Sequence, residues 1–97
     1  MPLTEASPPF VSVWDALEDT PAEAANMRLR SQLMLAIQKT VAQWGITQTE
    51  AAQRLDVTQP RLNDLLRGRI GNFSLDALIL LAERAGLSVR IEIAAAA

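Results

Sequence analysis

The sequence predicts an all-α fold, a bundle of four to five helices that ends in a single β-strand. Three observations predict it. The chain has 97 residues, which is room for one small domain. At four places a capping residue precedes apolar residues at helical spacing. Apolar and polar residues alternate only near the C-terminus. We divide the chain into an acidic arm at 1–19, a helical body at 20–87, and a strand with a tail at 88–97.

The first helix is expected over residues 21–44. The arm before it predicts no helix, because three of its first nine residues are prolines. Thr20 supplies the N-cap, Pro21 occupies the first turn, and Glu23 completes a capping box. Gly45 provides a left-handed exit. The inward stripe of this helix is formed by Leu33, Ile37, Val41 and Trp44.

Three shorter helices are expected next. Thr47 and Glu50 form a capping box that opens a helix at 48–55, and Thr58 caps a helix at 59–67 after a tight turn at Asp56. Ser74 caps the last helix, 75–85, which Gly86 ends. The residues that face inward from the three helices are Ala51, Ala52, Leu55, Leu62, Leu65, Leu66, Leu75, Leu78, Leu81 and Ala82.

The strand is predicted at residues 88–93, where Val89, Ile91 and Ile93 alternate with polar residues. A single strand leaves a row of backbone groups without hydrogen bonds. Pairing with the same strand of a second chain would satisfy them and give a twofold dimer. The alternative is an irregular tail along the body.

Charge is divided unevenly along the chain, whose net charge is −2. Residues 1–26 carry five acids and no base, whereas residues 27–97 carry nine bases and six acids, a charge of +3. This asymmetry indicates two surfaces with opposite preferences, or an acidic tail that only aids solubility.

Histidine and cysteine are both absent. The chain therefore lacks the commonest general base and the commonest metal ligands. It also has no glycine-rich phosphate loop. We expect no catalytic residues, no metal site and no cofactor, so the protein is not expected to be an enzyme. No segment has the character of a signal peptide or a membrane span, and we expect a cytoplasmic protein with no membrane partner.

The two short helices and the turn between them follow the helix-turn-helix plan, in which the second helix enters the major groove of double-stranded DNA. The leucines of residues 59–67 fall on one side of the helix and polar residues on the other. Asp64 could accept a hydrogen bond from a cytosine amine or orient Arg61 or Arg67. The predicted base-reading residues are Gln59, Pro60, Arg61, Asn63 and Asp64. The alternative is a polar face that only meets solvent.

Phosphate contacts are expected from helix N-termini and from nearby arginines. The predicted residues are Thr47, Gln48, Thr58, Arg67, Arg69, Asn72 and Ser74. Residues 47–72 carry four arginines against three acids, which predicts weak binding by one protomer. A homodimer that reads two half-sites is therefore the expected working form.

Residues 45–62, GITQTEAAQRLDVTQPRL, resemble the lambda-repressor-like, Cro/XRE helix-turn-helix domains. The resemblance extends through Gly86. Residues 13–21, VWDALEDTP, and 23–27, EAANM, look like the start of small HigA-type antitoxins. Asp56 stands where the family usually has glycine, and aspartate tolerates the left-handed conformation better than most residues.

The resemblance implies a sequence-specific transcriptional repressor that acts on its own operon, as the antitoxin of a HigBA-type pair. Its partner would be a small basic ribonuclease toxin, which an acidic arm suits electrostatically. Aromatic and apolar anchors with acids beside them would bind it: Phe10, Val13, Trp14, Asp15, Leu17, Glu18 and Asp19. Alternatively, Trp14 and Leu17 fold back on the protein's own helices. Two other functions stay open, a stand-alone XRE-family regulator and a protein-interaction adaptor.

Overall fold

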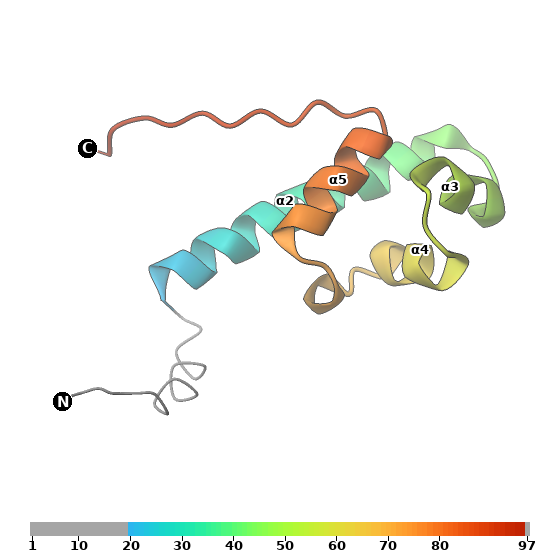
Figure 1. Ribbon diagram of the computed structural model, residues 1–97, viewed down its shortest axis with the longest axis horizontal. Helices are drawn as coiled ribbons and strands as arrows, with labels where there is room; N and C mark the ends of the chain where they lie inside the picture. Colours follow the sequence, from blue (N-terminus) through green and yellow to red (C-terminus); the bar gives the residue numbers. More distant parts are fainter. Residues whose placement is uncertain (1–19, 97) are drawn as a thin grey trace.

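The computed structural model describes residues 20–96. Within this range the chain forms four α-helices and one short 3-10 helix (Figure 1). Their bounds are Pro21–Trp44 (α2), Gln48–Leu55 (α3), Gln59–Leu66 (α4), Ile70–Asn72 (η1) and Leu75–Arg84 (α5). The all-helical prediction is confirmed for this part of the chain.

The predicted caps set the helix boundaries. The hydroxyl oxygens of Thr20, Thr47, Thr58 and Ser74 each accept a hydrogen bond from the backbone N–H three residues later. Gly45 ends α2 in the left-handed conformation, with φ of 62°. Helices α4 and α5 end one residue earlier than expected, because Arg67 and Ala85 form their C-caps.

The core lies where α2 packs on α5 and where α3 and α4 cross beside them. Phe73, which was not predicted to be a core residue, is fully buried after η1. Leu33, Trp44 and Leu66 were expected to face inward but are only partly buried at the core's edge, and Leu75 is also only partly buried. The buried residues are Met34, Ile37, Val41, Ala51, Ala52, Leu55, Leu62, Leu65, Phe73, Leu78, Leu81, Ala82 and Ala85.

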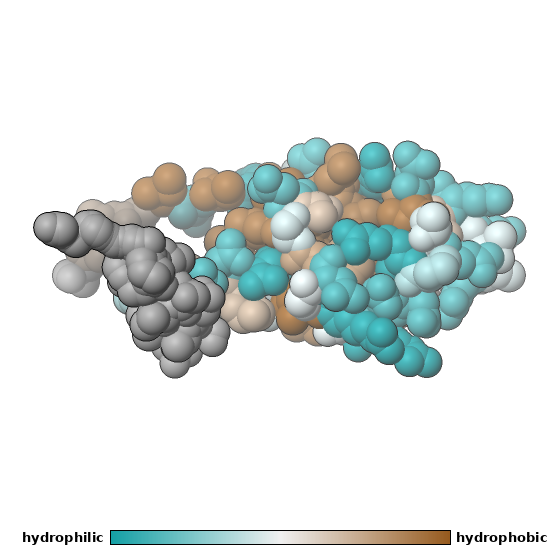
Figure 2. Space-filling model, turned by 60° about the horizontal axis from the view of Figure 1, so that its bottom comes forward, coloured by the Kyte–Doolittle hydropathy of each residue, from teal (hydrophilic) through white to brown (hydrophobic). Residues whose placement is uncertain are grey.

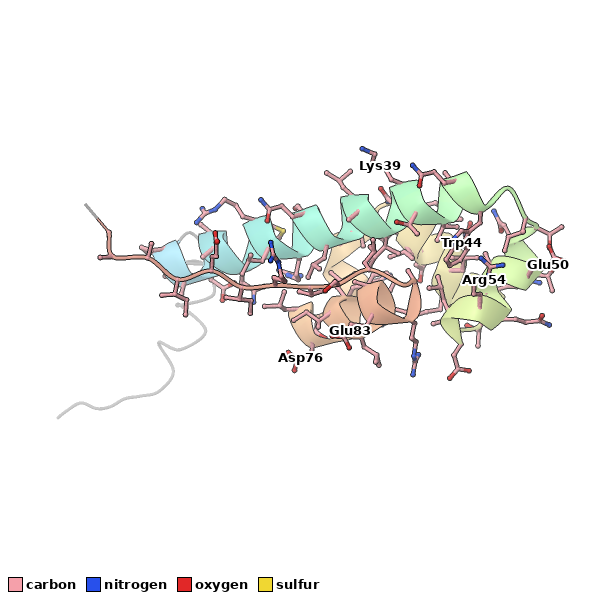
Figure 3. All side chains as sticks on the ribbon, turned by 90° about the horizontal axis from the view of Figure 1, so that it is seen from above. Lys39, Trp44, Glu50, Arg54, Asp76 and Glu83 are labelled. Carbon is pink, nitrogen blue, oxygen red and sulfur yellow. The ribbon has the colours of Figure 1, made fainter. Side chains whose placement is uncertain are left out.

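The strand predicted at residues 88–93 is not formed in the described chain. Residues 88–96 leave the end of α5 and run, without helix or strand, toward the end of the molecule that carries the N-terminus of α2 (Figures 1 and 3). They make no backbone hydrogen bond to any other described residue. The physical reason is that a strand needs an extended partner, and every other element between residues 20 and 87 is helical.

Candidate nucleic-acid interface

Helices α3 and α4 cross through a three-residue turn, residues 56–58. Asp56 adopts φ of 58°, the only positive value at a non-glycine residue within 20–96. The N–H of Val57 donates to the carbonyl of Ala52 at 2.9 Å, which closes the turn. The buried side chains of Ala51 and Ala52 are small, so the two helices approach closely.

A third helix holds this turn from behind. The guanidinium of Arg84 on α5 donates to the carbonyls of Leu55 and Asp56 at 3.2 and 3.4 Å. It also lies 3.7 Å from the carboxylate of Asp56. The angle between α3 and α4 is therefore fixed by contacts from the body of the domain.

Helix α4 buries Leu62 and Leu65 and turns its N-terminal end to solvent. Gln59 and Pro60 are exposed, and Asn63 and Asp64 are partly exposed. Figure 2 shows hydrophilic side chains across much of the face that carries α3 and α4. The predicted base-reading residues other than Arg61 thus share an accessible surface, which we call the α4 surface: Gln59, Pro60, Asn63 and Asp64.

Gln59 is oriented by the preceding helix. Its side-chain amide donates a hydrogen bond to the hydroxyl of Thr49 on α3 at 2.5 Å. Gln59 is exposed, and neither its second amide N–H nor its carbonyl oxygen has a side-chain hydrogen-bond partner within 20–96; such a donor–acceptor pair is what an adenine edge requires. Gln59 is therefore exposed and oriented by α3, and its role in base reading stays a prediction.

Arg61 differs from its predicted place, because its side chain turns toward the protein. The guanidinium stacks 4.0 Å from the centre of the Phe73 ring. It also donates a hydrogen bond to the carbonyl of Asn72 at 2.7 Å. Arg61 thus joins α4 to the segment after η1. Its role in base reading stays a prediction that these contacts do not support.

Asp64 forms no ion pair and no side-chain hydrogen bond with Arg61 or Arg67, the two residues it was expected to orient. One carboxylate oxygen lies 3.6 Å from the guanidinium of Arg69. The other accepts a hydrogen bond from the side-chain amide of Asn72 at 3.3 Å. Asp64 therefore contacts two residues predicted to bind phosphate.

The remaining predicted phosphate contacts lie at helix ends and in the loop after α4. The side chains of Thr47, Thr58 and Ser74 cap their helices, and their hydroxyl hydrogens are available to donate. Gln48 is exposed at the N-terminus of α3. Arg67 and Arg69 are exposed beside Gly68, and Arg67 has no ion-pair partner among residues 20–96.

Two supporting contacts were missed by sequence reasoning. Arg54 on α3 stacks 4.5 Å from the centre of the Trp44 ring, at the end of α2 (Figure 3). Arg30 on α2 donates to the carbonyls of Ile70 and Phe73, both at 3.3 Å. Arg54 and Trp44 face each other across the loop between α2 and α3, and Arg30 lies 40 residues or more from its partners in the sequence. Helical periodicity therefore gives no signal for either contact.

The predicted dimer residues lie on the C-terminal segment, residues 88–96. Val89 packs against the core, whereas Ile91 and Ile93 are 78% and 92% exposed. Beside them a groove of about 200 Å³ opens between α2, α5 and this segment. Its apolar walls include Leu29, Leu33, Leu75, Ile79, Val89 and Ile91.

Some predictions lie outside the described residues. The proposed toxin-binding residues belong to the arm: Phe10, Val13, Trp14, Asp15, Leu17, Glu18 and Asp19. Between residues 20 and 96, no helix combines the length and the hydropathy needed to cross a bilayer. The same range contains no group of three acidic side chains placed to hold a metal ion.

Comparison with known proteins agrees with this geometry. A protein-family model described as a helix-turn-helix domain matches residues 16–94, which include all four described helices. A search of curated proteins finds no match.

Proposed function

The chain belongs to the helix-turn-helix domain family, and from this membership we propose that it is a sequence-specific transcriptional repressor that binds double-stranded DNA as a homodimer. The family supports a DNA-binding regulator. Repression, sequence specificity and dimerisation are proposals that go beyond the family. They rest on the α4 surface, the arginines beside it and the C-terminal segment.

One observation carries the proposal: the N-terminal end of α4 presents Gln59, held by Thr49, on an exposed polar surface. In helix-turn-helix domains this end of the second helix meets base edges in the major groove. Buried Leu62 and Leu65 fasten the opposite side of α4 to the domain. A rigid helix with an oriented amide at its tip is suited to read sequence.

The test begins with selection of bound sequences from a random pool of double-stranded DNA, followed by fluorescence anisotropy on the selected site. We expect Gln59→Ala to weaken binding about tenfold and to relax the preference at one base position. Gln43→Ala, an exposed glutamine on α2, is the matched control and should bind like the wild type. A wild-type chain that enriches no sequence, even at low salt, would favour the protein-interaction adaptor instead.

The C-terminal segment supports the homodimer. Its backbone groups have no partner among residues 20–96, and two isoleucines on it are exposed. Antiparallel pairing with the same segment of a second chain satisfies the backbone groups. The same pairing would cover the exposed side chains of Ile91 and Ile93. Both features are thus accounted for by one twofold contact.

Native mass spectrometry tests this contact. We expect a dimer for the wild type and a monomer for the double variant Ile91→Asp/Ile93→Asp, because a charged strand face opposes burial. Leu80→Asp, at an exposed leucine on α5, is the control and should remain dimeric. A dimer that survives the double variant would show that another surface joins the protomers.

We propose further that the protein is the antitoxin of a toxin–antitoxin pair and that the acidic arm binds a small basic ribonuclease. The support is the charge of −5 over residues 1–26, together with the aromatic residues Phe10 and Trp14. A basic partner would be drawn to this region, while the arginines remain on the helical body. The alternative is a stand-alone regulator whose arm has no toxin to bind.

Co-expression with the product of the neighbouring gene distinguishes an antitoxin from a stand-alone regulator. An antitoxin should form a stable complex with that protein and suppress its ribonuclease activity in vitro. The variant Phe10→Ala/Trp14→Ala should lose the complex but keep DNA binding. A neighbouring protein that is neither basic nor a ribonuclease, or a complex that is insensitive to the double variant, would leave the stand-alone regulator as the better description.

A further inference from the structure

A carboxylate stands on the surface that is expected to meet phosphates. Asp64 belongs to the α4 surface, where a negative charge repels the phosphates of DNA. Its presence there needs an explanation other than direct phosphate binding. Its side chain is only 28% exposed, and both oxygens contact the segment that follows α4. The position of Asp64 is therefore explained by contacts within the protein.

The contacts of Asp64 reach two residues of one loop. Arg69 lies 3.6 Å from one oxygen, and Asn72 donates to the other at 3.3 Å. The guanidinium of Arg69 is still 53% exposed, so only part of it is used by Asp64. A guanidinium has five N–H donors in a planar fork, so Arg69 keeps donors that Asp64 does not use.

The loop itself is fixed from both sides. Arg61 of α4 stacks on Phe73 and donates to the carbonyl of Asn72. From α2, Arg30 donates to the carbonyl of Ile70, the first residue of η1, and to that of Phe73, the residue after η1. The backbone of residues 69–73 thus has a defined place relative to α4, and Asp64 adds the orientation of two side chains.

We propose that Asp64 is a positioning residue for DNA binding, which holds Arg69 and Asn72 in register with α4 so that Arg69 meets a backbone phosphate beside the base-reading site. This inference rests on the proposed function. Asp64 does not contact DNA in this arrangement. It restricts a long, flexible arginine side chain to the one orientation in which binding requires no further ordering.

Three possible roles for Asp64 predict different effects of Asp64→Ala on the affinity for DNA and on the selected sequence. If Asp64 only repels phosphates, Asp64→Ala should tighten binding to every sequence. If Asp64 reads a cytosine, the substitution should change the selected base at one position. If Asp64 positions Arg69, Asp64→Ala should weaken binding although the protein becomes more positive, and the selected sequence should remain the same.

A double-mutant cycle tests the positioning role. The dissociation constant for the selected site is measured by anisotropy for the wild type, Asp64→Ala, Arg69→Ala and the double variant. We expect each single variant to weaken binding by about threefold or more, and the double variant to be little weaker than Arg69→Ala. Asp64→Asn should fall between wild type and Asp64→Ala, because an amide oxygen can still accept from Asn72. Arg69→Ala removes one phosphate contact from each protomer, so it should also make the slope of log K against log salt shallower by about two units for the dimer.

The control is Glu83→Ala, which removes the same charge from α5, where no predicted DNA contact lies. It should not weaken binding, and thermal unfolding should show that Asp64→Ala remains folded. Additive effects of the two substitutions, or tighter binding by Asp64→Ala, would overturn the inference while leaving the proposed function standing. A wild-type chain that selects no DNA would instead remove the proposed function, and the inference with it.

Discussion

Single residues decide the geometry of the turn between α3 and α4. Asp56 adopts a left-handed conformation that glycine enters without cost and most other residues enter at a cost. Its exposed carboxylate also pairs with Arg84 at 3.7 Å, but an exposed ion pair contributes little to stability. The backbone conformation should therefore dominate the effect of substitutions here.

This dominance can be measured with two variants that both lack the carboxylate. Asp56→Ala should lower the free energy of unfolding by about 1 kcal/mol, because alanine is strained at a positive φ. Asp56→Gly should be as stable as the wild type or slightly more stable. Urea unfolding followed by circular dichroism compares them. Equal losses in both variants would mean that the ion pair with Arg84, and not the backbone, holds the turn.

Arg61 was predicted to read a base, but its side chain contacts the protein and connects α4 to the segment after η1. Because its guanidinium stacks on buried Phe73 and donates to Asn72, Arg61→Ala should lower the free energy of unfolding by about 1–2 kcal/mol. The base preferences of the selected DNA should stay the same. Urea unfolding and repeated selection measure the two effects. An unchanged stability with a lost base preference would restore Arg61 as a reader of sequence.

At the scale of elements, helix ends were predictable because their signals are local. Thr20, Thr47, Thr58 and Ser74 were each identified as N-caps from the chain alone, and each caps a helix. The strand was predicted from its alternation but needs a second extended segment, which the described chain does not contain. Local patterns thus specify where a helix begins, whereas pairing depends on what lies elsewhere.

The candidate site was predictable only in part, for the same reason. The exposed side of α4 follows from helical geometry, so Gln59, Pro60 and Asn63 were placed correctly on the surface. The partners of Arg61 and Asp64 depend on how residues 67–73 fold back against α4. Those contacts follow no regular spacing in the sequence. Nothing in the sequence around Phe73 distinguishes a core aromatic residue from an exposed one.

The capping box of α3 gives a prediction at this scale. The hydroxyl of Thr47 accepts from the N–H of Glu50 at 3.1 Å, and the N–H of Thr47 donates to the Glu50 carboxylate at 3.2 Å. Thr47→Ala should therefore lower the free energy of unfolding by about 1 kcal/mol. The matched control is Thr40→Ala within α2, where alanine is a better helix former and no loss is expected. Equal effects of the two substitutions in urea unfolding would contradict a capping role.

For the whole molecule, the distribution of charge matters more than its total. The net charge of −2 is unfavourable for a DNA-binding protein, but residues 1–26 carry five acids and no base, a charge of −5. Residues 27–97 carry +3, and the exposed arginines on or just after α3 and α4 are few: Arg54, Arg67 and Arg69. Under the proposed function, we therefore expect DNA binding to depend on placed side chains and on two protomers acting together, more than on a broad basic surface.

Binding through few phosphate contacts predicts that the association constant for DNA falls only gradually as the salt concentration rises. If the three exposed arginines of each protomer contact phosphate, a dimer neutralises about six phosphates, and log K should fall with log salt with a slope of about −5. The monomeric variant Ile91→Asp/Ile93→Asp should retain about half of that slope, because one protomer offers half of the contacts. Anisotropy titrations at several salt concentrations measure both slopes. A wild-type slope much steeper than −5 would mean that other cations contact DNA, whereas equal slopes for wild type and variant would mean that a single protomer makes all the phosphate contacts.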